Sequence, residues 1–200
     1  MSELVHEETN GKATIKIYYD TDPENPRSWD NLGTMICGHP RYNLGDDHSF
    51  DGGRAFLLDL LKLDEDVPYD VDALFTRAQK QAIILPVYLY DHSGLAMNTS
   101  GFSCPWDSGQ VGFIYVTLEE VRNEYKVQRV TQKLRQCISE FLSNEVKTYS
   151  DYLSGNVYGY VIEEDGVETE SCWGFIGDYD DHCLKEARNC VPLCKAHSDH

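Results

Sequence analysis

Residues 131–155 have the sequence TQKLRQCISEFLSNEVKTYSDYLSG, which carries the clearest periodic signal in the chain. Apolar side chains recur here at three- and four-residue spacing, so the pattern predicts a long helix over about 131–153. The periodic residues are Leu134, Cys137, Ile138, Phe141, Leu142, Val146, Tyr149, Tyr152 and Leu153. Ser154 and Gly155 favour a stop after it, because glycine readily adopts the left-handed conformation that ends many helices.

The next stretch, NVYGYVIEEDGVETESCWGF at 156–175, consists of two alternating segments on either side of Asp165 and Gly166. An Asp-Gly pair between alternating segments is a strong short-range signal for a β-hairpin. The sequence therefore predicts a long helix followed directly by a hairpin.

Outside this region, the predicted strands and helices do not alternate regularly along the chain. Alternating or β-branched segments predict strands over 13–20, 34–37, 82–90 and 110–117, and 3.6-residue periodicity predicts helices over 53–63, 71–81, 118–125 and 180–189. Thr117 and Glu120 match a capping box, and Pro86 favours an edge position or a bulge in its strand. This order favours an α+β fold: an antiparallel sheet of about four to five strands, with the long helix packed on one face.

Composition indicates one α+β domain over 1–178, followed by a C-terminal helix and a Cys/His-rich tail over 179–200. The chain has 200 residues, 41% of them hydrophobic, which suffices for a sizeable core. The first residues show no signal-peptide pattern, and the longest apolar run, 82–90, is too short to cross a bilayer. Seven cysteines, an odd number, fit reduced thiols rather than a disulfide framework. We therefore expect a cytoplasmic protein.

The charge balance is strongly acidic: 34 acidic against 17 basic residues give a formal net charge of −17. Such a protein repels nucleic-acid backbones and anionic membranes, so we expect neither as a direct partner. The acids are spread along the chain and would coat a folded surface. Two interpretations stay open, namely recognition of a basic partner and plain solubility.

Cys104, with His92 and Asp107 nearby in sequence, suggests a nucleophile, a base and an orienting group. Few cations lie around residues 91–110, although a reactive thiol needs an electropositive setting. The alternative is a turn that Gly101 and Gly109 shape, with Pro105 and Trp106 packed over the sheet. We favour the turn.

The C-terminal segment contains the best candidates for metal ligands: Cys183, Cys190, Cys194, His197 and His200. Their spacing is not that of a common zinc finger, in which ligands come in pairs two to four residues apart. Incidental thiols on a tail, or a helix with Cys183 and Leu184 packed inward, explain the segment as well. We predict no metal and no cofactor.

The loop over 30–53 holds histidines and acids but matches neither an EF-hand nor a phosphate-binding loop. An EF-hand needs acids at alternate positions and a glutamate at the twelfth. The pattern indicates instead a long structural loop that Arg41 fixes by pairing with a carboxylate.

Three blocks of sequence resemble one known family. They are PENPRSWDNLGTMICGHPRYNLGD at 23–46, YLYDHSGLAMNTSGFSCPWDSGQVGFIYVT at 88–117 and GNVYGYVIEEDGVETESCWGFIGD at 155–178. Together they are similar to a family of small acidic proteins encoded by bacteriophages and mobile elements. The resemblance implies an accessory role against host immunity, and it identifies no catalytic residues that could be assigned to this chain.

The leading hypothesis is an acidic, phage-encoded inhibitor of a host defence nucleoprotein, of the anti-CRISPR or antirestriction type. It would act as a DNA mimic, without enzymatic activity, by placing carboxylates in a basic nucleic-acid groove. The candidate contacts are Asp64, Glu65, Asp66, Asp70 and Asp72 between two helices, and Glu163, Glu164, Asp165, Glu168 and Glu170 on the hairpin.

The alternative hypothesis is a small-molecule-binding protein or a hydrolase. Its site would be a cleft that contains His39, His92, Cys104 and Asp107. A pocket with at least three of these groups within hydrogen-bonding reach would favour this alternative.

Overall fold

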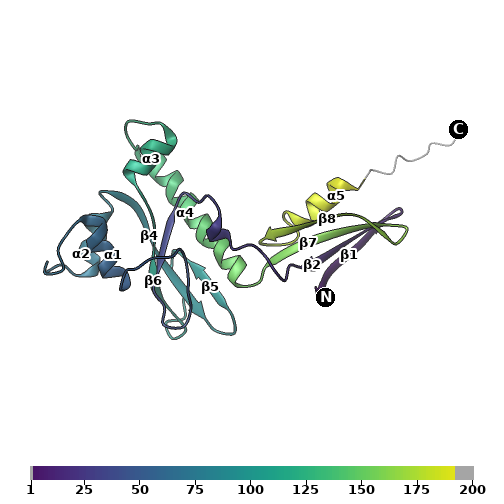
Figure 1. The fold of residues 1–200 in the computed structure, drawn as a ribbon, viewed down its shortest axis with the longest axis horizontal. Coiled ribbons are helices and arrows are strands. Elements are labelled where there is room, and N and C mark those ends of the chain that lie inside the picture. Colours follow the sequence, from purple (N-terminus) through teal and green to yellow (C-terminus); the bar gives the residue numbers. More distant parts are fainter. Residues whose placement is uncertain (1, 192–200) are drawn as a thin grey trace. The chain divides into compact units, whose positions relative to one another are not determined.

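The computed structural model describes residues 2–191, and within that range it confirms the α+β class. Among these described residues, eight strands form two antiparallel sheets, accompanied by five α-helices (Figure 1). The chain divides into two compact units, each with its own sheet. Residues 26–150 form the central unit, and residues 2–25 with 151–191 form the terminal unit.

The sheet of the central unit has the strand order β3-β6-β4-β5, with every neighbouring pair antiparallel. The strands are β3 (Thr34–Cys37), β4 (Ala82–Asp91), β5 (Leu95–Asn98) and β6 (Ser108–Thr117). The sequence predicts β3, β4 and β6 but not β5. β5 pairs with β4 only from Tyr88 onward, so at Pro86 one edge of β4 is unpaired. A β-bulge in β4 follows between Val87 and Tyr88. Both features accommodate the missing N–H of Pro86.

Helices cover both faces of this sheet. On one face lie α1 (Gly52–Leu61) and α2 (Val71–Ala78). The ring centroids of Phe56 and Tyr115 are 4.8 Å apart, and those of Phe75 and Phe113 are 5.5 Å apart. On the other lies the long helix α4 (Gln132–Leu153), which Figure 1 shows opposite α1 and α2. Because residues alternate across β6, Ile114 points toward α4, where it and Leu142 close over Gly33.

The helix α3 (Leu118–Tyr125) begins at the predicted capping box. The Glu120 amide donates to Thr117 Oγ1 at 3.2 Å, and the Thr117 amide donates to Glu120 Oε2 at 2.8 Å. Both bonds satisfy amides that the first helical turn leaves without partners. Local sequence therefore determines where this helix starts.

The terminal unit has a second sheet with the order β1-β2-β7-β8. Its strands are β1 (Leu4–Asn10), β2 (Ala13–Tyr19), β7 (Val157–Glu164) and β8 (Val167–Ile176). Asp165 and Gly166 have φ of 50° and 80°, the two positive values that a type I′ turn requires, so the predicted hairpin is confirmed. β1 is a strand that the sequence analysis does not predict.

The helix α5 (Cys183–Cys190) covers one face of this second sheet. Cys183 and Leu184 are buried against Ile15 and Tyr160, as expected for a helix packed inward. Burial raises the pKa of the Cys183 thiol to about 12, so this cysteine stays protonated.

An ion pair joins β1 to α5 at the edge of this core. Arg188 donates from Nη2 and Nε to the two carboxylate oxygens of Glu8, at 2.6 and 2.8 Å. The hydrogen bond from Arg188 lowers the pKa of Glu8 to about 2.

Within residues 2–191, no helix is both long and apolar enough to cross a membrane.

Candidate functional site

The hairpin of β7 and β8 carries the second set of candidate contacts. Lys16 Nζ lies 2.7 Å from Glu163 Oε1, and Lys12 Nζ lies 3.5 Å from Asp165 Oδ2. The other three carboxylates have no lysine or arginine partner within the described residues, and all three are exposed. These are Glu164, Glu168 and Glu170. Three of the five candidate acids thus face solvent without a compensating cation.

Two of the hairpin acids oppose each other across the strands. Glu163 of β7 pairs in register with Glu168 of β8. Like charges directly opposite in an antiparallel pair destabilise the sheet. Lys16 compensates on the Glu163 side only. The sheet therefore retains electrostatic repulsion between Glu163 and Glu168, which would be absent if these two residues were uncharged.

The face of this sheet opposite α5 carries an exposed aromatic centre. Gly159 alternates with the buried Tyr158 and Tyr160, so it points away from α5. Trp173 packs directly over Gly159, and its ring centroid lies 6.4 Å from that of Tyr18. The Trp173 side chain remains 44% exposed. An exposed indole is suited to contact with another protein.

The first set of candidate contacts lies between α1 and α2 and, for Asp72, in the first turn of α2, all in the central unit. All five side chains are exposed. Asp70 also has a structural role, because its Oδ1 accepts from the Ala73 amide at 2.8 Å and caps α2. Arg54 fixes the segment by donating to the carbonyls of Glu65 and Val67, both at 3.1 Å. The two candidate sets thus belong to different units.

The net charge is divided unevenly between the two units. Residues 1–25 and 151–200 contain 17 of the 34 acidic side chains but only 5 of the 17 basic ones, a formal charge of −12. Residues 26–150 contain the other 17 acids with 12 basic side chains, a formal charge of −5. The smaller unit therefore carries most of the excess negative charge.

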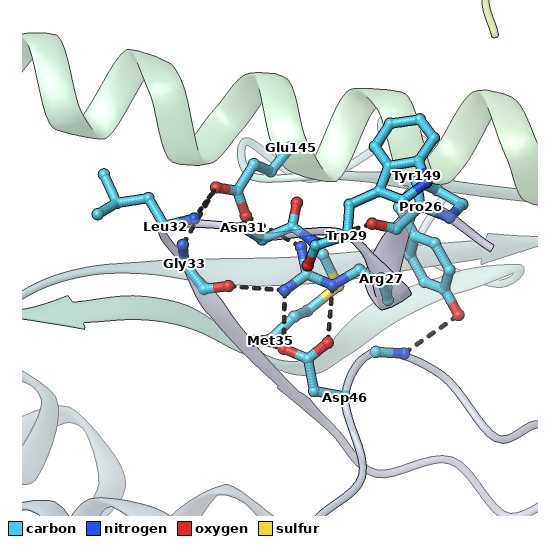
Figure 2. A network of polar contacts seen from close by, with 11 residues as sticks. Pro26, Arg27, Trp29, Asn31, Leu32, Gly33, Met35, Asp46, Glu145 and Tyr149 are labelled. Carbon is cyan, nitrogen blue, oxygen red and sulfur yellow. Dashed lines mark hydrogen bonds and ion pairs between the residues drawn. The ribbon is translucent and has the colours of Figure 1, made fainter. Parts of the chain in front are cut away.

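The most buried polar network lies in the central unit and surrounds Arg27, in the 3₁₀ turn Pro26–Ser28 (Figure 2). The side chain of Arg27 is only 4% exposed. It donates to Asp46 Oδ2 at 2.7 Å, to Glu145 Oε2 at 2.9 Å and to the Gly33 carbonyl at 2.6 Å. The sequence analysis does not predict this network.

The two carboxylates of the network also bind backbone amides. Glu145 Oε1 accepts from the amides of Leu32 and Gly33 at 3.0 and 3.1 Å, and Asp46 Oδ2 accepts from the Met35 amide at 2.7 Å. Figure 2 shows the Asp46 carboxylate and the Gly33 carbonyl meeting at the guanidinium below α4, and the amides of Leu32 and Gly33 bound to Glu145. The arrangement fastens the start of β3 and the turn at Asp46 to α4, so its role is structural.

The structure brings together three of the four groups of the alternative site. Cys104 Sγ donates to Asp107 Oδ2 at 3.4 Å, and His92 Nδ1 lies 3.5 Å from the same oxygen. The carboxylate therefore lies between the thiol and the imidazole. In a catalytic relay of nucleophile, base and orienting group, the base contacts the nucleophile directly. Here the Cys104 thiol and the His92 imidazole each contact Asp107 instead.

The fourth group, His39, stacks on Tyr42 and lines a cavity of about 480 Å³ together with Asp107. Arg41, which borders the same cavity, pairs with Asp91, so the predicted pairing of this arginine with a carboxylate is confirmed.

The segment before β6 confirms only part of the predicted turn. Gly101 has a φ of 84°, which only glycine adopts readily, so the glycine-shaped turn is confirmed there. Gly109 lies within β6 and is not among the glycines with positive φ. The prediction that Trp106 packs over the sheet is wrong, because this residue precedes β6, lies at the rim of the same cavity and is 92% exposed.

No group of three or more metal-ligating side chains is suitably arranged within residues 2–191. Cys190 Sγ contacts the Tyr160 hydroxyl at 3.4 Å. The other candidate ligands of the tail, Cys194, His197 and His200, lie outside the described residues.

Comparison of the chain with protein-family models, with curated proteins and with solved structures finds no match in any of the three.

Proposed function

We propose that the protein is a stoichiometric inhibitor that binds the basic nucleic-acid groove of another protein through the acidic hairpin of its terminal unit. The observation that carries this proposal is the concentration of formal charge in that unit, −12 against −5. The resemblance to phage-encoded proteins suggests a host defence nucleoprotein, of the anti-CRISPR or antirestriction type, as the target. No catalytic step is involved.

Electrostatics explains how such a surface competes with nucleic acid. Duplex DNA carries about one charge per 1.7 Å of axis, and a protein that binds it uses lysine and arginine side chains to neutralise phosphates. Glu164, Glu168 and Glu170 present carboxylates to the same side chains from a hairpin whose turn is fixed. Charge of one sign also accelerates encounter with an oppositely charged groove.

The opposed acids and the exposed indole support a contact surface rather than plain solubility. The Glu163–Glu168 pair costs stability in the free protein, and a cation from a partner would remove that cost. Trp173 provides an exposed aromatic side chain on the same hairpin, and in many interfaces a few aromatic residues contribute most of the binding energy.

Neutralising the hairpin is expected to abolish capture of nucleic-acid-binding proteins. The immobilised protein is incubated with a bacterial lysate, and bound proteins are displaced with duplex DNA at constant salt. Glu164→Gln, Glu168→Gln and Glu170→Gln together should lower the DNA-displaceable fraction by at least about tenfold, because each lost charge contact weakens binding. Capture by the unchanged protein should fall steeply as salt rises.

The matched control neutralises an equal number of exposed acids in the central unit: Asp64→Asn, Glu65→Gln and Asp66→Asn. This variant should capture the same proteins as the unchanged chain. Equal losses in both variants would show that net charge alone is responsible, and the proposed contact surface would then be wrong.

A second candidate function, a small-molecule-binding protein or a hydrolase, is favoured by one observation. Cys104 and His92 meet at the carboxylate of Asp107, beside the cavity that His39 lines. Only His39 and Asp107 of the four groups line that cavity, and the thiol and the imidazole contact the carboxylate rather than each other.

Thiol reactivity tests this second candidate. If Cys104 is a nucleophile, iodoacetamide should modify it at least about tenfold faster at neutral pH than Cys137, because only the thiolate reacts. Cys137 is exposed on α4 and serves as the internal reference, with rates read from digested peptides by mass spectrometry. Equal or slower modification of Cys104 would rule out a nucleophilic role.

A further inference from the structure

Three exposed aromatic side chains gather on one surface of the central unit. Trp29 is 44% exposed, Tyr125 41% and Phe141 47%, although aromatic rings of this size are usually buried. Trp29 and Phe141 line one cavity of about 290 Å³, and Tyr125 and Phe141 line another of about 480 Å³. Both cavities also include Asp30 and Asn31, so they form one continuous depression, the aromatic groove.

The aromatic groove has a rigid base. Asn31 Nδ2 donates to the carbonyls of Pro26 and Trp29, at 2.8 and 3.0 Å. The Arg27–Glu145 ion pair fastens the same turn to α4, the helix that carries Phe141. Figure 2 shows Trp29 beside this network, next to α4. A preformed surface loses little conformational entropy on binding, which favours affinity.

The charges around the aromatic groove indicate what it binds. Asp30, Glu120 and Glu124 line it. Its basic lining residues are Lys126 and Arg27, and the Arg27 side chain is only 4% exposed and already paired with Asp46 and Glu145. Glu120 is engaged in the capping box, but Asp30 and Glu124 are available to a ligand's cations. Arginine and lysine are attracted both to carboxylates and to the faces of tryptophan, tyrosine and phenylalanine. Apolar side chains fit the remaining aromatic surface.

We propose that the aromatic groove binds a cationic segment of another protein, in which arginine or lysine residues alternate with apolar ones. This contact lies in the central unit, does not involve the hairpin acids and therefore goes beyond the proposed function. Aromatic anchors in a preformed depression with a charged rim are the arrangement in which a few residues dominate binding. Nucleic acid does not fit, because its phosphates would face the acidic rim.

Peptide binding tests the inference. The probe is a fluorescein-labelled nonapeptide of alternating arginine and leucine, titrated with the full chain at about 150 mM salt and followed by anisotropy, since screening then suppresses diffuse charge attraction. Phe141→Ala and Trp29→Ala should each weaken binding at least about tenfold, because each removes a central anchor. A peptide with serine in place of leucine should bind weakly and respond little to either change.

Two controls separate the aromatic groove from other surfaces. Trp106→Ala removes an indole that is 92% exposed and lies outside the aromatic groove, so it should leave peptide binding unchanged. The triple glutamine variant of the hairpin should affect both peptides equally and by a small factor. The two proposals can therefore fail independently.

Two results would overturn the inference. In the first, Phe141→Ala binds the arginine–leucine peptide as tightly as the unchanged protein does, while circular dichroism shows both to be folded. In the second, sedimentation shows a dimer that Phe141→Ala dissociates, which would make the aromatic groove an interface between copies of this chain.

Discussion

Replacing Arg27 by alanine is expected to lower the free energy of unfolding by about 3–5 kcal/mol. The side chains of Arg27 and Glu145 are 4% and 8% exposed, so the change leaves a nearly buried carboxylate without its cation. Asp46 also loses two hydrogen bonds from the guanidinium, at 2.7 and 2.8 Å. Removing one partner of a buried ion pair costs far more than the pair contributes, because the remaining charge stays desolvated.

Urea unfolding followed by circular dichroism measures this loss. The matched control is Arg41→Ala, which also removes an arginine–aspartate pair, but one whose arginine side chain is 66% exposed. It should cost less than about 1 kcal/mol, as exposed pairs do. Arg27→Lys should recover only part of the stability, because one ammonium group cannot reproduce the forked geometry of guanidinium. Equal losses for Arg27→Ala and Arg41→Ala would mean that the network does not stabilise the fold.

The sequence predicts the features that depend on neighbouring residues. The capping box at Thr117, the Asp165-Gly166 turn and the extent of β3 follow from a few adjacent side chains, and each is confirmed. The long helix follows from periodicity over six turns. In each case the decisive interaction lies within four residues or is set by backbone conformation.

Features that depend on distant parts of the chain were not predicted. Arg27 lies 19 residues from Asp46 and 118 from Glu145, and no spacing pattern links such residues. β1 is an edge strand whose side chains are mostly polar and partly exposed, so its hydrophobic alternation is weak. β2 and β7 pair although the whole central unit separates them in sequence. The terminal unit therefore assembles from both ends of the chain.

The same distinction applies to the candidate sites. Cys104, Asp107 and His92 were grouped because they are close in sequence, and the structure brings them into contact. The uneven charge between units was not predicted, since it depends on which segments share a sheet. The aromatic groove was not predicted either. Phe141 has the helical spacing of a core residue, and only the packing of α4 leaves it 47% exposed.

The second large effect is expected from Gly112→Ala, in the middle of β6. Gly112 lies between β3 and β4, paired with Cys37 and Val87 beside the bulge. A Cβ atom at this position would overlap the carbonyl oxygen of Ile36 and lie 2.9 Å from Cys37 Cα. These are backbone atoms, so no change of rotamer relieves the overlap, and β3 must move away from β6. Glycine in a strand often marks such a close backbone approach.

Displacing β3 also strains the Arg27 network, because the Met35 amide of that strand donates to Asp46. We therefore expect Gly112→Ala to cost about 3 kcal/mol or more, at the upper end for overpacking of a protein interior. The control is Gly109→Ala in the same strand, where an added Cβ meets no atom within 4 Å and the change should stay within about 0.5 kcal/mol. Urea unfolding of both variants measures the difference. If Gly112→Ala is as stable as Gly109→Ala, the pairing of β3 with β6 in this register is wrong, and with it the placement of Asp46 beside Arg27.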